Sequence, residues 1–109
     1  MANAFKNRTL RQVGTSPVDV GAVVASSTET TLIGMTLANV TSGVINVTVQ
    51  LINGGTTTHI VKDAPIPTGG ALVAVGGDQK IVLITGDKVT ITSNTASSCD
   101  VIMSFLEIT

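Results

Sequence analysis

Apolar and polar residues alternate along most of this chain with the period of two that is typical of half-buried β-strands. The clearest case is the segment 45–51, INVTVQL, in which every second residue is apolar. The segment 88–92, KVTIT, repeats the pattern, with Val89 and Ile91 predicted to face inward. Alternation of this kind predicts sheets with one face in the core and the other face in water.

Glycine-containing turns separate the apolar runs. Glycine pairs stand at 54–55, 69–70 and 76–77, and Gly86-Asp87 breaks the run that follows the last pair. Because glycine adopts positive φ angles without steric cost, these positions predict tight turns between short strands. The pairs lack the following lysine and helix of a phosphate-binding loop, so they are interpreted as turns.

Short connections lead to expectations about which strands pair. Residues 29–39 and 45–51 are expected to form an antiparallel hairpin, because few residues separate them. Residues 18–24 are expected to form one short strand, and residues 64–91 a ladder of successive strands. Ile66 stands between two prolines, which donate no ladder hydrogen bonds, so it is expected in a loop or an edge strand.

Together these segments predict a single all-β domain. The chain has 109 residues, enough for one hydrophobic core, and valine and threonine favour sheet over helix. About eight or nine short strands without crossover helices indicate an antiparallel β-sandwich with jelly-roll or Greek-key wiring. An immunoglobulin domain is disfavoured because tryptophan and a cysteine pair are absent.

The last predicted strand, residues 100–108, departs from simple alternation because it is apolar on both faces. One face carries Val101, Met103 and Phe105, and the other carries Ile102, Leu106 and Ile108. A strand of this kind needs cover on both sides. We expect the second set to contact another copy of the chain, so the sequence predicts a homo-oligomer with closed symmetry.

The first twelve residues differ in composition from the rest. They contain Lys6, Arg8 and Arg11, half of the six basic residues, together with Phe5 and no acid. Two interpretations stay open: a separate N-terminal arm (residues 1–12) before a sandwich domain (13–109), or an edge strand of that domain. As an arm, it would dock on an acidic groove of another protein, with Phe5 as an apolar anchor, and its deletion would leave the domain folded.

Composition excludes several classes of function. The net charge of −1 gives no field that would attract nucleic acid or an anionic membrane. Neither a membrane-spanning run nor a secretory leader is expected from the short apolar stretches. Two phenylalanines, with no tryptophan or tyrosine, supply no aromatic platform for bases or sugars.

Catalytic and metal chemistry also lack their usual residues. His59 is the sole histidine, and in an extended strand Asp63 would lie about 13 Å from it, too far for a hydrogen bond. One histidine and one cysteine are too few for a zinc site, and the aspartates are spread over separate turns. Cys99 is expected to be a buried, inert thiol. We therefore predict no enzyme activity, no cofactor and no metal.

The pattern as a whole resembles a known group of proteins. The segments FKNRTLRQVGTSP, IGMTLANVTSGVINVTVQL, HIVKDAPIPTGGALVAVGGDQKIVLITGDKVTIT and SNTASSCDVIMSFLEIT cover most of the chain. They resemble small virion structural proteins of tailed bacteriophages, particularly phages that infect cyanobacteria. The resemblance implies a β-sandwich component of the capsid (as a decoration or cement protein), neck or tail, made in the host cytoplasm and docked on other virion proteins. A receptor- or glycan-binding module of a phage fibre is the alternative.

Overall fold

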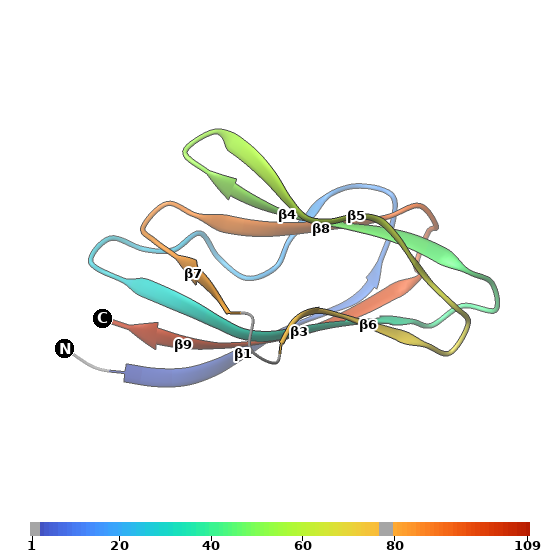
Figure 1. The fold of residues 1–109 in the computed structure, drawn as a ribbon, viewed down its shortest axis with the longest axis horizontal. Coiled ribbons are helices and arrows are strands. Elements are labelled where there is room, and N and C mark those ends of the chain that lie inside the picture. Colours follow the sequence, from blue (N-terminus) through green and yellow to red (C-terminus); the bar gives the residue numbers. More distant parts are fainter. Residues whose placement is uncertain (1–2, 77–79) are drawn as a thin grey trace.

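The computed structural model describes residues 3–76 and 80–109, which form nine strands and no helix (Figure 1). The strands are β1 (Asn3–Val13), β2 (Val18–Asp19), β3 (Glu29–Asn39), β4 (Ile45–Asn53), β5 (Thr56–Ile66), β6 (Ala71–Val75), β7 (Ile81–Leu83), β8 (Lys88–Ser93) and β9 (Cys99–Ile108). Two antiparallel sheets face each other, so the predicted all-β sandwich is confirmed. The predicted turn across Gly77 and Asp78 lies outside the described residues.

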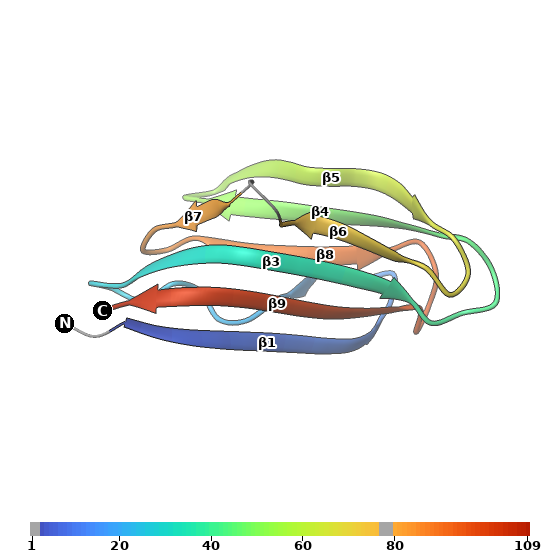
Figure 2. The ribbon, with the colours of Figure 1, turned by 60° about the horizontal axis from the view of Figure 1, so that its bottom comes forward.

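The strands form nested antiparallel pairs, and this arrangement folds over into two layers. β4 pairs with β5, β3 with β6 and β7, β2 with β8, and β1 with β9. Rolling adds the pairs β3–β9 and β4–β8, which gives the sheet orders β1-β9-β3-β6, with β7 also on β3, and β2-β8-β4-β5. This is a jelly roll, in agreement with the sequence prediction. Figure 2 shows the first sheet, with β1 along its rim.

The expected hairpin of residues 29–39 with 45–51 is wrong. These segments are β3 and β4, which lie in opposite sheets, because β3 already has β9 on one side and β6 and β7 on the other. The side chain of Asn39 holds the crossing in place. Its amide donates hydrogen bonds to the carbonyls of Gly43 at 2.7 Å and Ile66 at 2.9 Å, which links the ends of β3 and β5.

Two further expectations about pairing are corrected. Residues 64–91 form no successive ladder, because β6 and β7 both pair with β3 and β8 belongs to the other sheet. Residues 18–24 form a strand only at Val18–Asp19, since Gly21 has a φ of +80° and turns the chain away. By contrast, the turn at 54–55 is confirmed: it joins β4 to β5, and both glycines have positive φ.

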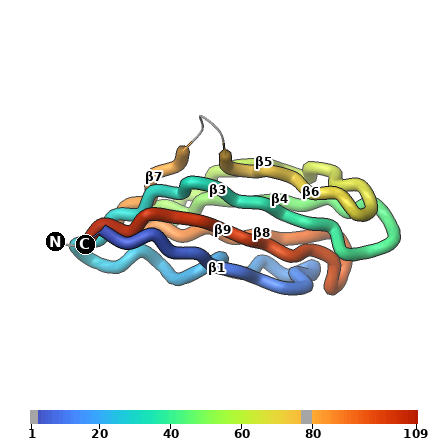
Figure 3. Tube along the Cα trace, turned by 90° about the horizontal axis from the view of Figure 1, so that it is seen from below, coloured from blue at the N-terminus to red at the C-terminus, as the bar shows by residue number. Residues whose placement is uncertain are grey.

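The core fills the space between the sheets with aliphatic side chains, as the alternation predicts. From the first sheet the buried residues are Leu32, Met35, Leu37, Val75, Leu83, Val101, Met103 and Phe105, and from the second Ile45, Val47, Val49, Ile66, Val89 and Ile91. Phe105 of β9 is buried in the core, whereas Phe5 of β1 is exposed and lies outside it. Viewed from below, Figure 3 shows the strands of the first sheet side by side, with both chain ends on the same side of the molecule.

Candidate assembly surface

The two faces of β9 differ in how far they are buried. Val101, Met103 and Phe105 point into the core and are buried, while Ile102 on the other face is 58% exposed. β1 and β3 flank β9 on either side, so its backbone is fully paired within the sheet. The apolar side chains on its outward face therefore have no cover within the described part of the chain other than their neighbours on the same sheet.

The register of the sheet places further apolar side chains beside those of β9. Leu106 lies opposite Phe5 of β1 and Thr31 of β3, and Val82 of β7 lies beyond Thr31. A second row is formed in the same way by Thr9, Ile102, Thr36 and Val73. Neither row contains a charged residue, although the row between them holds Asn7, Ser104 and Gly34, and Ile108 lies opposite Asn3 and Glu29.

We define the outer apolar face by six residues: Phe5, Val73, Val82, Ile102, Leu106 and Ile108. Phe5 is 79% exposed, Val73 64% and Val82 59%, while Leu106 and Ile108 are half-buried; exposed apolar side chains gathered on one sheet face are typical of an interaction surface. The sequence had already indicated four of these residues: Ile102, Leu106 and Ile108 from the last strand, which is apolar on both faces, and Phe5 from the N-terminal segment. Val73 and Val82 were missed, because the sequence does not show that β6 and β7 flank β3.

The outer face of the second sheet has the opposite character. Its central cross-strand pairs are Gln50 with His59, Gln50 with Thr90, and Thr48 with Thr92. Ile52 continues the same face opposite Thr57 and Lys88, and Thr90 is buried. Gln50 Nε2 lies 3.1 Å from His59 Nε2, within hydrogen-bond distance. A polar face of this kind is stable in water, so the two outer faces of the sandwich suit different surroundings.

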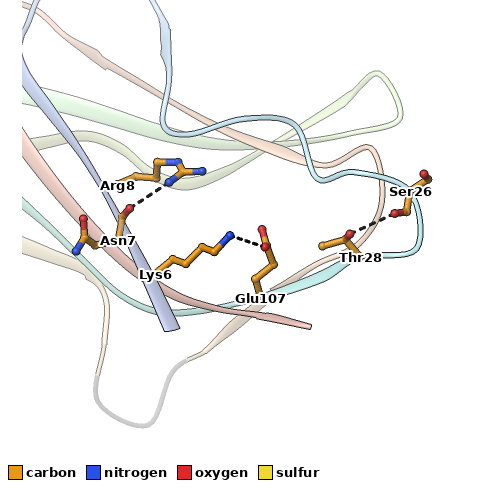
Figure 4. A network of polar contacts seen from close by, with 6 residues as sticks. All are labelled: Lys6, Asn7, Arg8, Ser26, Thr28 and Glu107. Carbon is orange, nitrogen blue, oxygen red and sulfur yellow. Dashed lines mark hydrogen bonds and ion pairs between the residues drawn. The ribbon is translucent and has the colours of Figure 1, made fainter. Parts of the chain in front are cut away.

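β1 distributes its predicted contact residues over both of its sides. Phe5 belongs to the outer apolar face, whereas Lys6 and Arg8 point to the opposite side of the strand, where Lys6 Nζ forms an ion pair with Glu107 Oε1 at 2.8 Å. The Arg8 guanidinium lies 5.5 Å from the centre of the Phe105 ring and donates to the carbonyl of Asn7 at 3.3 Å (Figure 4). The structure therefore does not gather Phe5, Lys6 and Arg8 into one cluster.

Arg11 lies at the irregular end of β1. The pairing with β9 shifts between Leu10 and Val13, and Gln12 has a φ of +54°. The backbone N–H of Gln12 donates a hydrogen bond to Asp100 Oδ1 at 2.9 Å, which fixes this bulge against the start of β9. Arg11 is exposed beside it.

The reactive groups of the described residues do not form a catalytic arrangement. Cys99 is buried, and its burial, followed by the nearby charge of Asp100, raises the pKa of the thiol to about 11. A thiol of this kind is protonated and inert at neutral pH. Among the described residues, His59 lies within hydrogen-bond distance of Gln50, which is neither a carboxylate nor a nucleophile.

Asp87 has a structural role in a turn. It is buried, and its carboxylate accepts hydrogen bonds from Asn53 Nδ2 at 2.6 Å and from the Ile84 amide at 3.1 Å. This agrees with the interpretation of the aspartates as turn residues. Within residues 3–76 and 80–109, no group of three or more His, Cys, Asp or Glu side chains could hold a metal ion.

The hollows of the surface are shallow or small. A hollow of about 40 Å³ lies beside Arg8 and Phe105. An open groove of about 410 Å³ is lined by four apolar residues and by Thr58 and His59; the apolar residues are Leu51, Ile60, Ala74 and Ile81. The groove lacks the convergent polar groups of a small-molecule site. In the part of the chain that the structure describes, no helix is long and apolar enough to cross a membrane.

Comparisons with known proteins give a result at the level of fold. No protein-family model matches the sequence, and no curated protein is similar to it. Among solved structures, a chain of the Bacillus endospore appendages, described as disulfide-linked pili, superposes with a TM-score of 0.62 over 98% of this chain and 88% of that one, at 16% identity. This chain therefore shares its fold with a protein that forms pili.

Weaker matches are found among viral proteins. A pentameric capsid protein from metagenomic phage sequences matches with a TM-score of 0.41 and 15% identity, over 92% of this chain and 59% of that one. A structure of infectious bursal disease virus, strain Gx, matches with a TM-score of 0.44 and 12% identity, over 97% of this chain and 31% of that one. At these scores neither match supports an argument about fold or function.

Proposed function

We propose that this chain is a non-enzymatic structural subunit of a tailed-bacteriophage virion and that it self-associates through the outer apolar face. The observation that carries the proposal is the contrast between the two outer faces of the sandwich. The two rows that include Ile102 and Leu106 carry five apolar side chains, three threonines and no charge, whereas the face that includes Gln50 and Thr92 is mainly polar. Burial of an apolar face of this kind against a second copy is favourable.

The sequence and the fold support the same class of protein. The sequence resembles small virion structural proteins of tailed phages, which serve in capsids, necks and tails. The fold is shared with a chain of the Bacillus endospore appendages, which are described as disulfide-linked pili. We infer that the copies of this chain form a closed assembly, which leaves no open interface. A trimer is preferred because threefold positions recur in the capsids and fibres of the particles that the sequence resemblance implies.

Sedimentation of the purified protein tests the self-association. We expect the wild type to form an oligomer and Leu106→Lys and Ile102→Lys to be monomers, because each would bury an unpaired charge in the interface at a cost of several kcal/mol. Thr92→Lys, on the polar face of the other sheet, is the matched control and should assemble normally. A wild-type protein that stays monomeric at high micromolar concentration would exclude this role of the outer apolar face.

The location in a virion requires a separate measurement. Mass spectrometry of purified phage particles should detect the chain in stoichiometric amounts with the other structural proteins. If the chain occurs in the lysate and never in particles, it is not a virion component. Electron microscopy of the same particles then separates the capsid, neck and tail as its location.

A further inference from the structure

The edge strands of the two sheets differ in how well they are protected against pairing with another chain. Natural proteins block such edges with short strands, prolines, bulges or charges. β2 has two residues and follows Pro17, and β6 and β7 have five and three residues. β5 is longer, but it contains Asp63 with a φ of +49° and Pro65, and its register with β4 shifts twice. These edges are all poor templates for an added strand.

β1 is the exception among the described edges. It has eleven residues, and Asn3 to Leu10 pair one by one with β9 without a bulge or a proline. Residues 5–9 are all exposed. Within residues 3–76 and 80–109, the backbone of residues 3–10 pairs with β9 alone, and Figures 2 and 3 show β1 along the rim of its sheet. The far edge of β1 therefore offers a long, regular row of backbone donors and acceptors.

The side chains of β1 define the charge of a matching strand. Its charged residues are all cations, and Lys6 and Arg8 are two positions apart, so they lie on the same side of the strand. Lys6 is paired with Glu107, whereas Arg8 contacts the Phe105 ring and a backbone carbonyl. A neighbouring strand with acidic residues at every second position would place a carboxylate opposite each of these cations, which is favourable in cross-strand pairs.

We infer that the free edge of β1 binds an extended acidic segment of another protein, which adds a strand to the sheet. The inference rests on the proposed function, since it names the chemistry of a docking partner for the assembled subunit. The affinity comes from main-chain hydrogen bonds, and the alternating acids select the partner. The Arg8 side chain swings away from the Asn7 carbonyl and pairs with the incoming carboxylate.

The symmetric registers that centre the cationic part of β1 on β1 of a second copy are unfavourable. Symmetric antiparallel registers centred on Lys6, Asn7 or Arg8 place a cation opposite its own copy or Lys6 opposite Arg8, and like charges in direct opposition are destabilising. The seven acidic residues of the chain include no two that are separated by a single position. The matching segment therefore belongs to a different protein.

The test uses a capped, fluorescent peptide of alternating threonine and glutamate, as long as β1, and measures its anisotropy with the full-length protein. Two further peptides carry N-methyl groups on alternate amides, one set in each phase. We expect the parent peptide to bind and one N-methylated peptide to lose more than about tenfold in affinity, because its blocked amides face β1, while the other binds as the parent does. No binding of the parent, or equal binding of both methylated peptides, overturns the added strand.

Variants test the charges and separate this inference from the proposed function. Arg8→Glu should weaken binding of the acidic peptide, and Leu106→Lys, on the outer apolar face, should bind it as the wild type does. A wild type that forms oligomers without binding the peptide overturns the inference and leaves the proposed function intact. A monomeric wild type that binds the parent peptide and distinguishes the two methylated peptides overturns the self-association and supports the inference.

Discussion

At the scale of single residues, a few buried polar side chains fix connections that the apolar pattern leaves open. Asn39 is buried at the end of β3, and its amide donates to carbonyls of Gly43 and Ile66 while its oxygen accepts from the Thr41 amide at 2.8 Å. Among the described residues, no buried side-chain nitrogen or oxygen lacks a partner. Because an unpaired buried carbonyl is costly, Asn39 specifies where the chain leaves one sheet for the other.

Replacement of this side chain tests its role. We expect Asn39→Ala to lower the free energy of unfolding by about 2–4 kcal/mol, because two carbonyls lose their donors at once. Urea denaturation of the monomeric Leu106→Lys background measures the change without a contribution from assembly. Asn7→Ala, at an exposed position of β1, is the control and should change stability by less than about 0.5 kcal/mol. An equal loss in both variants would contradict a specific role of Asn39.

The pKa of Cys99 predicts a dependence of stability on alkaline pH. Burial raises the pKa of this thiol from 9.0 to about 11. As the pH rises above 9, the unfolded chain loses the thiol proton before the folded chain does, so this contribution to stability falls until the pH passes about 11. Urea denaturation between these pH values should show a steeper loss for the wild type than for Cys99→Ala. Parallel curves would mean that the folded thiol titrates as an ordinary one.

At the scale of elements, β1 carries the proposed docking edge, and its neighbour β9 carries three residues of the outer apolar face. The composition of the first twelve residues left two alternatives, an arm or an edge strand, and Asn3–Val13 lies in the sheet beside β9. Cross-strand pairing and the burial of Val13 hold it there. A cationic edge strand keeps its side chains available for a partner while its backbone is already ordered, so docking requires less ordering than a free arm would.

Deletion of residues 1–11 tests the contribution of β1. We expect the thermal midpoint to fall by more than about 10 °C, because each kcal/mol lost shifts the midpoint of a domain of this size by roughly 4–8 °C and the deletion exposes one edge of β9. Differential scanning calorimetry measures the shift in the Leu106→Lys background. A midpoint within a few degrees of the full-length protein would show that the segment is a dispensable arm.

At the scale of the whole molecule, the two sheets give the sandwich one apolar and one polar outer face. The pili of the superposed Bacillus chain are described as disulfide-linked. The single cysteine of this chain, Cys99, is buried, so it is not available for a link between folded copies. The proposed assembly through the outer apolar face depends instead on the burial of side chains such as Ile102 and Leu106.

This mode of assembly predicts a response to salt. Self-association should be unchanged between low and moderate sodium chloride and should strengthen in sodium sulfate, because the two rows of the face carry no charge and sulfate favours apolar burial. Sedimentation equilibrium in the three solutions measures the association constant. Weakening by sodium chloride would indicate an interface built on ion pairs, in contrast to the outer apolar face. Binding of the acidic peptide to β1 should weaken as the salt concentration rises, because salt screens exposed charge pairs.

The sequence by itself determined the local properties of the chain. Alternation set which side chains of β4 and β9 face the core, and glycine set the turn at 54–55, because both effects depend on near neighbours along the chain. In β8 it set the burial of Val89 and Ile91, although Thr90 between them is buried as well. The two apolar faces of residues 100–108 were also visible, and with them Ile102, Leu106 and Ile108 as candidates. These features need no knowledge of which strand pairs with which.

Only the tertiary structure decided the pairing of strands and the extent of the candidate surface. Residues 29–39 and 45–51 look like a hairpin locally, but β9, β6 and β7 occupy both edges of β3 and send β4 to the other sheet. The same pairing brings Val73 and Val82 beside the row of β9 and separates Phe5 from Lys6. Sheet neighbours come from distant parts of the chain, and the choice among them depends on packing of the whole core, which no local pattern encodes.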